Sequence, residues 1–368
     1  MFIDVRVIFD DIPDPRRETK NKLHRFGDIL FIVLSALVSG VHDWLAMEVF
    51  AEEREAWLRQ YIALENGTPS HDTLSRVIGL LKPELFAECF RRWMQQALPH
   101  LDGLHIAIDG KTLRGSDYGE GMAHIVSAFT SGSQLVIAQQ SMNGKESEIK
   151  TIPKVLEMLP LSGAIVSIDA IGAQKKIVQQ IVEAKADYVI SLKENQPTLL
   201  HDAQTTIDND RENKKISCIE IAQKSHGRAE CRRSWLTALP ESLRERTGWV
   251  GLVAVGLIES QRTIKGKTSV ENRYYLTSLT DNAEFAKTVR AHWSIENQQH
   301  WVLDVQFDED ANRSRKDYRA TNLAVMRRMA LNLLRRDPED KRSMVKRKMR
   351  ACFNDAERTK ILFGDQMT

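Results

Sequence analysis

The sequence predicts a mixed α/β protein with a helical N-terminal region and a β-rich segment in its second half. Hydrophobic residues keep helical spacing over residues 26–98, whereas short aliphatic runs alternate with helical segments between residues 104 and 192. A third pattern, of alternating strand-like segments, covers residues 198–279. Because the middle segments are joined both by a tight turn and by helices, we expect antiparallel and parallel pairing in one sheet.

The composition is that of an ordinary folded protein. The 368 residues are 42% hydrophobic and 28% charged, which allows a large core and two or three domains. The net charge of +2 means that any affinity for nucleic acid must come from local patches. Four scattered cysteines without zinc spacing indicate a reducing, cytoplasmic compartment. The longest apolar run, residues 29–38, is too short to span a membrane.

The N-terminal region begins with a basic, proline-punctuated arm over residues 9–25, which is either a solvated leader or a phosphate contact. The helical pattern of residues 26–98 is interrupted at 67–70, where Ser70 is a good N-cap for the next helix. A helix, a tight turn and a second helix are typical of DNA-binding helix-turn-helix domains, and also of simple packed bundles.

The central feature is the stretch LHIAIDGKTLRGS at residues 104–116. Its alternating aliphatic residues predict a buried strand that presents Asp109 at its C-terminal end, where Gly110 allows a sharp turn. Three cationic side chains are expected around this carboxylate: His105, Lys111 and Arg114. Taken alone, Asp109 could equally be a capping residue of the following turn.

A second strand with the same ending follows. The segments after Asp109 are predicted, in order, as a hairpin of strands 124–130 and 134–140, a helix 152–159 with Pro153 in its first turn, a strand 164–169, a helix 174–184 and a strand 188–192. Asp169 ends the second of the aliphatic strands, and Lys193 follows the last one. Asp109 and Asp169 therefore occupy equivalent positions, at the strand ends where α/β sheets bind ligands.

Two further stretches carry polar residues of interest. The β-rich segment contains predicted strands at 218–222, 231–236, 250–258 and 273–279, and the turn His226-Gly227-Arg228 is either a hairpin tip or a phosphate contact. Residues 289–305 predict a helix that places Glu296, His300 and Asp304 at successive i,i+4 positions. An amphipathic helix is predicted at 323–334, followed by a basic stretch at 335–350.

Two aspartates at strand ends and a helical glutamate, without histidine or cysteine ligands, favour a hard, oxygen-preferring cation. Two such ions about 4 Å apart can activate an attacking oxygen and stabilise a leaving oxygen in phosphoryl transfer. This is the DDE arrangement of ribonuclease-H-like nucleases and transposases. The sequences IAIDGKTLRGS, SIDAIGAQKK, HGR, RYYLTSL and HWSIENQQHWVLDVQFDED resemble those of the H-repeat-associated transposases, which are found near Rhs elements and as independent insertion sequences.

The resemblance covers nearly the whole chain, including DPR and NGTPSHDTLSRV in the N-terminal region. It implies a helical, DNA-binding domain at residues 1–100 and a ribonuclease-H-like domain at 101–368, a mixed sheet with helices on both faces. A β-rich insertion at about 198–280 and a basic helical tail at about 335–368 belong to the second domain.

The resemblance also implies the chemistry. Asp109, Asp169 and Glu296 would form the catalytic, metal-binding triad for Mg²⁺ or Mn²⁺, with two ions. The enzyme would cut the ends of a mobile element and join the 3′-OH to target DNA, assembled as a homodimer on DNA. Seven residues are expected to contact DNA: Lys111, Arg114, Lys193, His226, Arg228, Arg290 and His300.

The sequence departs from related transposases near the glutamate. Val289, His292 and Leu303 replace a Tyr, an Arg and a Lys that related insertion-sequence transposases carry, so Arg290 and His300 are the expected substitutes. Ala173 stands where a cysteine is expected, a change that should affect only packing. The alternatives are a domesticated DNA nuclease without strand transfer, a catalytically silent DNA-binding protein, and a metal-dependent phosphatase, which would explain neither the β-rich segment nor the basic tail.

Overall fold

The computed structural model describes residues 4–20, 22–117, 121–142, 147–225 and 228–364. The chain divides into two compact units. The first unit is assembled from three separated pieces, residues 1–100, 110–147 and 296–368, and the second unit contains residues 101–109 and 148–295. Each unit therefore joins segments that lie far apart in the sequence.

The described residues form nine strands in one mixed sheet, whose order is β3-β2-β1-β4-β5-β9-β8-β7-β6. The strands are β1 (His105–Thr112), β2 (His124–Thr130), β3 (Leu135–Ser141), β4 (Ile165–Ile168), β5 (Asp187–Leu192), β6 (Ile219–Ser225), β7 (Arg228–Ala238), β8 (Ala254–Ile264) and β9 (Lys267–Thr277). Strand β4 pairs in parallel with β1 and β5, whereas the pairs β2–β3, β5–β9, β9–β8, β8–β7 and β7–β6 are antiparallel. The predicted mixed α/β class is confirmed.

The first unit contains most of the helices. They are α1 (Val5–Asp10), α2 (Phe26–Val38), α3 (Trp44–Glu53), α4 (Glu55–Leu58), α5 (His71–Leu80), α6 (Pro83–Ala97), α12 (Trp301–Phe307), α13 (Arg319–Leu334), α14 (Met344–Phe353) and α15 (Asp355–Phe363). The Ser70 side chain accepts a hydrogen bond from the Thr73 amide, so the predicted N-cap of α5 is confirmed.

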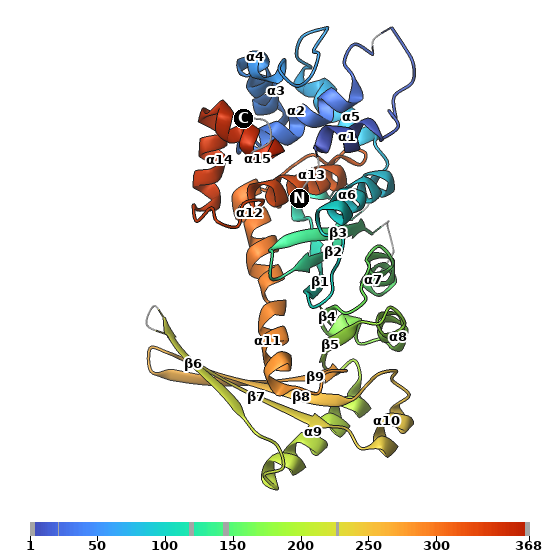
Figure 1. The fold of residues 1–368 in the computed structure, drawn as a ribbon, viewed down its shortest axis with the longest axis vertical. Helices are drawn as coiled ribbons and strands as arrows, with labels where there is room; N and C mark the ends of the chain where they lie inside the picture. Colours follow the sequence, from blue (N-terminus) through green and yellow to red (C-terminus); the bar gives the residue numbers. More distant parts are fainter. Residues whose placement is uncertain (1–3, 21, 118–120, 143–146, 226–227, 365–368) are drawn as a thin grey trace. The chain divides into compact units, whose positions relative to one another are not determined.

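Helix α13 is the centre of this unit, because it packs against α2, α5, α6 and strand β3 (Figure 1). The prediction that this helix is amphipathic is wrong. It is buried on all sides, and even Arg327 and Arg328 are at most 1% exposed. A helix enclosed by neighbours on every side has no solvated face, so its polar residues must find partners inside the core.

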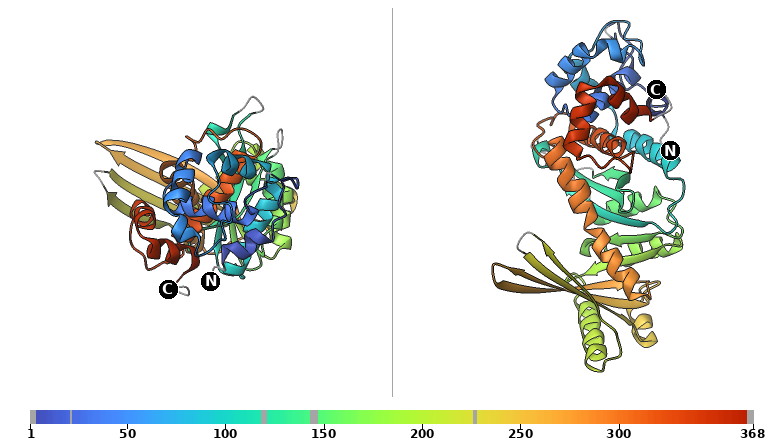
Figure 2. Two further views of the ribbon diagram at one scale, coloured as in Figure 1. Left: turned by 90° about the horizontal axis from the view of Figure 1, so that it is seen from above. Right: turned by 60° about the vertical axis from the view of Figure 1, so that its left-hand side comes forward.

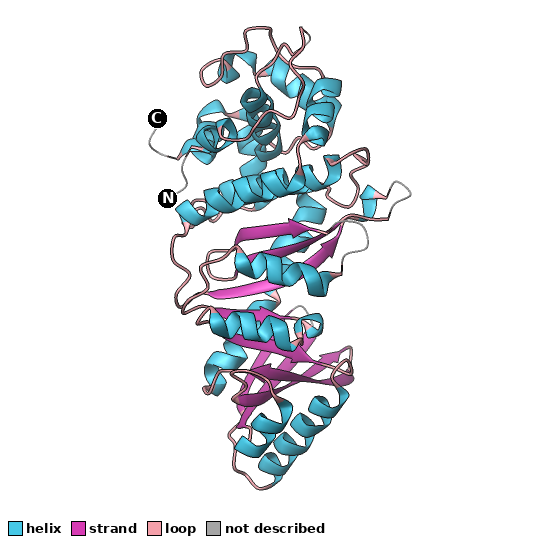
Figure 3. Ribbon diagram, turned by 90° about the vertical axis from the view of Figure 1, so that its right-hand side faces the viewer, coloured by secondary structure: helices cyan, strands magenta, loops and turns pink. Residues whose placement is uncertain are grey.

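The second unit places helices on both faces of its part of the sheet. Its helices are α7 (Glu148–Glu157), α8 (Lys175–Glu183), α9 (Pro197–Glu212), α10 (Glu241–Thr247) and α11 (Asn282–His292). Figure 1 shows α11 on one side of β4 and β5, and α7 and α8 on the other. Figure 3 faces the side that carries α7 and α8. Helix α7 begins before the predicted start, so Pro153 lies inside it, not in its first turn.

The β-rich segment has the four predicted strands, but three of them are 11 residues long and two helices were missed. The long strands form a ribbon that continues the sheet beyond β5 (Figure 2). Pro197 occupies the first turn of the missed helix α9, a position that proline favours. That signal was available in the sequence.

The basic C-terminal stretch packs onto the first unit as α14 and α15, which contact α2 and α13. Arg358 is fully buried and Lys348 is 8% exposed. Arg342 pairs with Asp340 at 2.8 Å and with Glu357 at 3.0 Å. Much of the positive charge of this stretch is therefore neutralised or enclosed within the protein. Among the described helices, none has the length and apolar character needed to cross a membrane.

Candidate active site

The structure brings Asp109 and Asp169 together in the second unit. Strands β1 and β4 are parallel neighbours with Ile108 opposite Ile168, so the aspartates directly follow paired residues. One detail of the prediction is wrong, because β1 continues through Thr112 and the chain does not turn at Gly110. Asp109 thus lies within a strand, whereas Asp169 lies where β4 ends.

Asp169 is held by the turn that follows it. Its carboxylate accepts a hydrogen bond of 3.0 Å from the Ile171 amide and caps a short 3₁₀ helix, Ala170–Gly172. Burial raises the pKa of Asp169, and the negative charge of Glu148 raises it further, whereas the Ile171 amide and Lys193 lower it. A bound cation would favour the charged form of this carboxylate.

Two side chains that the sequence did not single out fix the same turn. Asn195 donates a hydrogen bond of 2.7 Å to the Ala170 carbonyl, and Gln196 donates one of 2.9 Å to the Ala173 carbonyl. Ala173 is fully buried, in agreement with a packing role for this position. The loop after β5 therefore orders the loop that carries Asp169.

A chain of hydrogen bonds joins both strands to helix α11. Ser167 Oγ lies 2.7 Å from His105 Nε2 and 2.7 Å from His292 Nδ1. His105 was predicted to be cationic, and this is wrong, because burial lowers its pKa to about 3. Burial also lowers the pKa of His292 to about 4. The two neutral imidazoles tie β1, β4 and α11 together beside the aspartates, an arrangement that no local sequence pattern reveals.

These histidines should make the protein less stable in acid. An unperturbed histidine has a pKa of about 6.5, so below about pH 6.5 the unfolded chain binds protons that the folded chain rejects. The contribution of the two neutral histidines to the unfolding free energy is therefore complete above the unfolded-state pKa. It is lost as the pH falls towards their folded-state pKa values. We expect His292→Gln to reduce the pH dependence of the unfolding free energy between about pH 6 and about pH 4 by about 1.4 kcal/mol per pH unit. Urea unfolding at each pH measures this, and an unchanged slope would contradict it.

In the first unit, Lys111 is enclosed between two carboxylates. It is 8% exposed, and its Nζ lies 2.7 Å from Asp304 and 3.1 Å from Asp310. Burial raises the pKa of Asp304, and Lys111 opposes that shift. Arg114, by contrast, is exposed, and its guanidinium lies 3.6 Å from the Asp310 carboxylate, farther than the Lys111 ammonium lies from either of its partners. Lys111 therefore serves the packing of residues 304–310, while Arg114 is accessible to a ligand.

Gly115 explains why the motif DGKTLRGS contains its second glycine. A Cβ atom there would lie 2.1 Å from the Asn312 carbonyl oxygen and 2.7 Å from that of Asp310. We expect Gly115→Ala to destabilise the protein by about 1–3 kcal/mol, because backbone atoms cannot move aside cheaply. Gly132→Ala, where nothing lies within 4 Å, is the matched control, and equal urea midpoints for the two variants would refute the packing argument.

Glu296 belongs to the first unit and is exposed. The predicted continuous α-helix is wrong in one respect, because residues Ile295–His300 form a π-helical segment between α11 and α12. Its wider turn alters the i,i+4 alignment that was expected for Glu296, His300 and Asp304. π-Helical segments inside helices are frequent at functional sites, which is consistent with a role for Glu296.

The remaining predicted DNA contacts have different surroundings. Lys193 and Arg290 are exposed, and His300 is partly buried. Arg228 lies at the start of β7, but its side chain and all of His226 lie outside the described residues. Val289 and Leu303, two of the positions that differ from related transposases, are buried.

The donor set is suited to a hard cation. Asp109 and Asp169 offer only oxygen ligands, which Mg²⁺ and Mn²⁺ prefer. Within the described part of the chain no group of three or more His, Cys, Asp or Glu side chains is gathered closely enough to hold a metal ion. The role of the two aspartates as metal ligands, like that of any third ligand, is therefore a proposal.

Comparison with known families identifies the chain. The model described as "Transposase DDE domain" matches residues 100–333, and the model described as "DDE_Tnp_1-associated" matches residues 7–94. The chain belongs to the DDE transposase family. This DDE transposase is 40% identical over 346 residues to the "Putative transposase YncI" of Escherichia coli O157:H7, covering 92% of this chain and 88% of the relative.

Two further relatives match most of the chain. The "H repeat-associated putative transposase YhhI" of Escherichia coli (strain K12) is 36% identical over 354 residues, covering 94% of the transposase and 93% of YhhI. An "Uncharacterized protein in dhlA 3'region" of Xanthobacter autotrophicus is 41% identical over 283 residues, covering 76% of this chain and 96% of that protein. The predicted resemblance to H-repeat-associated transposases is confirmed.

Proposed function

We propose that this protein is a metal-dependent DNA transposase that cuts the ends of an insertion sequence and joins the freed 3′-OH to target DNA. The observation that carries the proposal is that Asp109 and Asp169 directly follow the paired residues Ile108 and Ile168 of two parallel strands, in a chain of the DDE transposase family. The mixed sheet of strands β1–β5, with helices on both faces, is in keeping with a ribonuclease-H-like core for the domain at 101–368.

In this proposal Asp109, Asp169 and Glu296 hold the metal. Two Mg²⁺ or Mn²⁺ ions would activate the attacking oxygen and stabilise the leaving oxygen. The aspartates offer only oxygen ligands, which suit such ions. Burial disfavours the charged form of Asp169, and a bound cation would offset this effect. The hydrogen-bond chain through Ser167 would keep β1, β4 and α11 in register while DNA binds.

The accessible cations supply the DNA contacts in the proposal. Arg114, Lys193 and Arg290 are exposed and are assigned to backbone phosphates, together with Arg228, His226 and His300. Lys111 is assigned a supporting role, since its ammonium is paired with two carboxylates. The helical region 1–100 would bind DNA as well, and bridging two element ends would require a homodimer.

Strand transfer distinguishes this proposal from a nuclease. Purified protein is incubated with Mg²⁺, a labelled duplex that carries the element end and a supercoiled target plasmid, and joined products are counted. A transposase yields label covalently joined to the plasmid. Cleavage without joining would support the nuclease alternative, and binding without cleavage in Mg²⁺ or Mn²⁺ would support a DNA-binding protein.

A further inference from the structure

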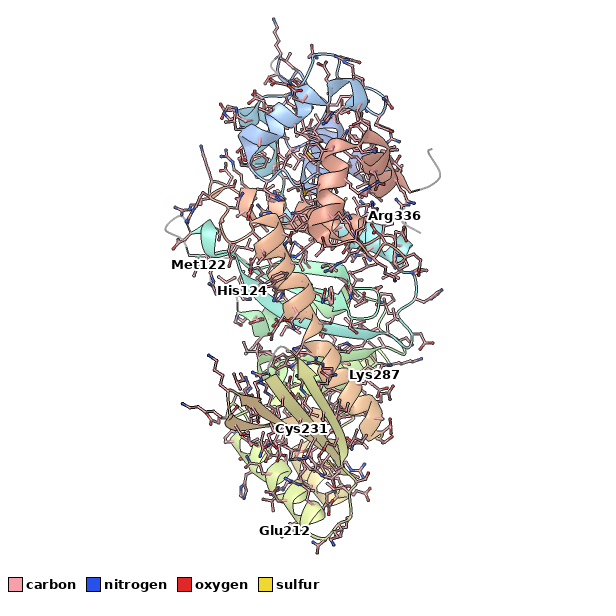
Figure 4. All side chains as sticks on the ribbon, turned by 90° about the vertical axis from the view of Figure 1, so that its left-hand side faces the viewer. Met122, His124, Glu212, Cys231, Lys287 and Arg336 are labelled. Atoms are coloured by element: carbon pink, nitrogen blue, oxygen red, sulfur yellow. The ribbon has the colours of Figure 1, made fainter. Side chains whose placement is uncertain are left out.

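A cavity lies between helix α11 and one face of the β6–β9 ribbon, wholly within the second unit. Figure 4 labels Cys231 on β7 and Lys287 on α11, the elements on its two sides. Its apolar lining includes Ile258 and Val289, which are 7% and 6% exposed. Arginines from three elements converge on it: Arg232 of β7, Arg273 of β9 and Arg290 of α11. The cavity therefore combines apolar side chains with several cationic ones.

The arginines differ in how their charge is balanced. Arg232 pairs with Glu230 at 2.5 Å, and Arg273 pairs with Glu271 at 2.8 Å while lying 4.5 Å above the Trp293 ring. Arg290 has no ion-pair partner among the residues whose side chains the structure describes. Burial and the charge of Arg232 lower the pKa of Arg290, whereas Glu230 raises it. Arg233, which also lines the pocket, pairs with Glu220 at 2.6 Å and with Glu259 at 2.9 Å. Among the pocket arginines, Arg290 is therefore the one whose charge no described carboxylate pairs, and the charge of Arg232 acts on it.

We propose that this pocket binds one backbone phosphate of DNA, with Arg290 and Arg232 as the donors. The inference rests on the proposed transposase function and extends it to a site on the β6–β9 ribbon. A bound phosphodiester would neutralise the positive charge of Arg290, which Glu230 does not balance because it pairs with Arg232. Guanidinium donors match phosphate oxygens in pairs, through charge-assisted hydrogen bonds. Arg273 forms a cation–π contact with the Trp293 ring, which positions a third cation in the pocket lining.

The test measures binding, not cleavage. Fluorescence anisotropy with a labelled duplex carrying the element end is recorded in EDTA at several salt concentrations for full-length wild type, Arg290→Gln and Arg232→Gln. Arg244→Gln is the matched control, because Arg244 is exposed on α10 of the same unit and does not line the pocket. We expect about tenfold weaker binding for each pocket variant, and a slope of log affinity against log salt that is shallower by about 0.9 per lost phosphate contact. Arg244→Gln should match wild type.

The substitution Arg290→Lys separates the effect of charge from that of donor geometry, since it keeps the positive charge and removes the planar pair of N–H donors. It should retain the wild-type salt slope while losing part of the affinity. Arg290→Gln is the safer variant to fold, because Arg290 is exposed and gives up no ion pair within the described side chains. Thermal unfolding of every variant checks that the fold is intact.

Each outcome decides the inference. Affinity and salt slope that are unchanged in both pocket variants would overturn it, while wild-type binding would leave the transposase proposal standing. Calorimetric titration with inorganic phosphate separates the two sources of the ligand. Phosphate binding that disappears in Arg290→Gln while DNA affinity is unchanged would mean a free-anion site and overturn the DNA assignment. If wild type fails to bind the duplex, the proposed function falls and this inference falls with it.

Discussion

Asp169→Asn is expected to reduce DNA cleavage by on the order of 10²–10³-fold while leaving DNA affinity within about twofold of wild type. The substitution keeps the shape of the side chain and the acceptor for the Ile171 amide, but it removes the negative charge that would hold a cation. Asp109→Asn should behave in the same way, because the register of β1 and β4 places the two residues next to each other. Gel analysis of a labelled duplex, with binding measured separately by anisotropy, gives both quantities.

Glu148→Gln is the control for this prediction. Glu148 is a carboxylate close enough to Asp169 to raise its pKa, but it begins helix α7 and is not assigned to the metal. Its neutralisation should leave cleavage within a few fold of wild type. Cleavage by Asp169→Asn at the wild-type rate would show that Asp169 is a capping residue of the 3₁₀ turn.

Glu309→Gln is expected to destabilise the first unit by about 3–5 kcal/mol. Glu309 is 2% exposed and pairs with the fully buried Arg328 at 2.8 Å. Arg327 lies beside this pair, where burial lowers its pKa and Glu309 opposes that effect. Removal of the carboxylate charge would leave Arg328 without its ion-pair partner and Arg327 with only the more distant charge of the exposed Asp308, which costs far more than loss of a surface pair.

The size of this effect is measured by urea unfolding at neutral pH. Glu339→Gln is the matched control, since Glu339 is exposed in the loop between α13 and α14 and should change the unfolding free energy by less than about 0.5 kcal/mol. A loss of less than about 1 kcal/mol in Glu309→Gln would mean that buried water or a relaxed core already neutralises the arginines.

Local patterns were sufficient to predict the strands that carry the aspartates. Aliphatic runs that end in a carboxylate identified β1 and β4, and Ser70 identified the start of α5. These features depend on residues a few positions apart, so period and capping rules can detect them. The serine and glycine residues between β2 and β3 predicted that hairpin in the same way.

The features that the sequence did not predict include buried charges and neutral histidines, which depend on contacts between residues far apart in the chain. Nothing near Arg328 indicates burial, because its partner Glu309 is 19 residues away and the helix is enclosed by elements from the N-terminal region. The neutral state of His105 follows from its burial, and its imidazole contacts Ser167, which is 62 residues away. Helical periodicity alone predicts an uninterrupted α-helix through Glu296, so the π-helical segment was not expected from the sequence.

Glu296 is proposed to act with Asp109 and Asp169 as a metal ligand. The most direct test is cleavage of the labelled element end by Glu296→Gln and wild type, with Mg²⁺ and with EDTA. We predict that wild type cuts only with Mg²⁺ and that Glu296→Gln binds the duplex but does not cut it. Cutting by Glu296→Gln at the wild-type rate, or cutting by wild type in EDTA, would contradict the metal triad.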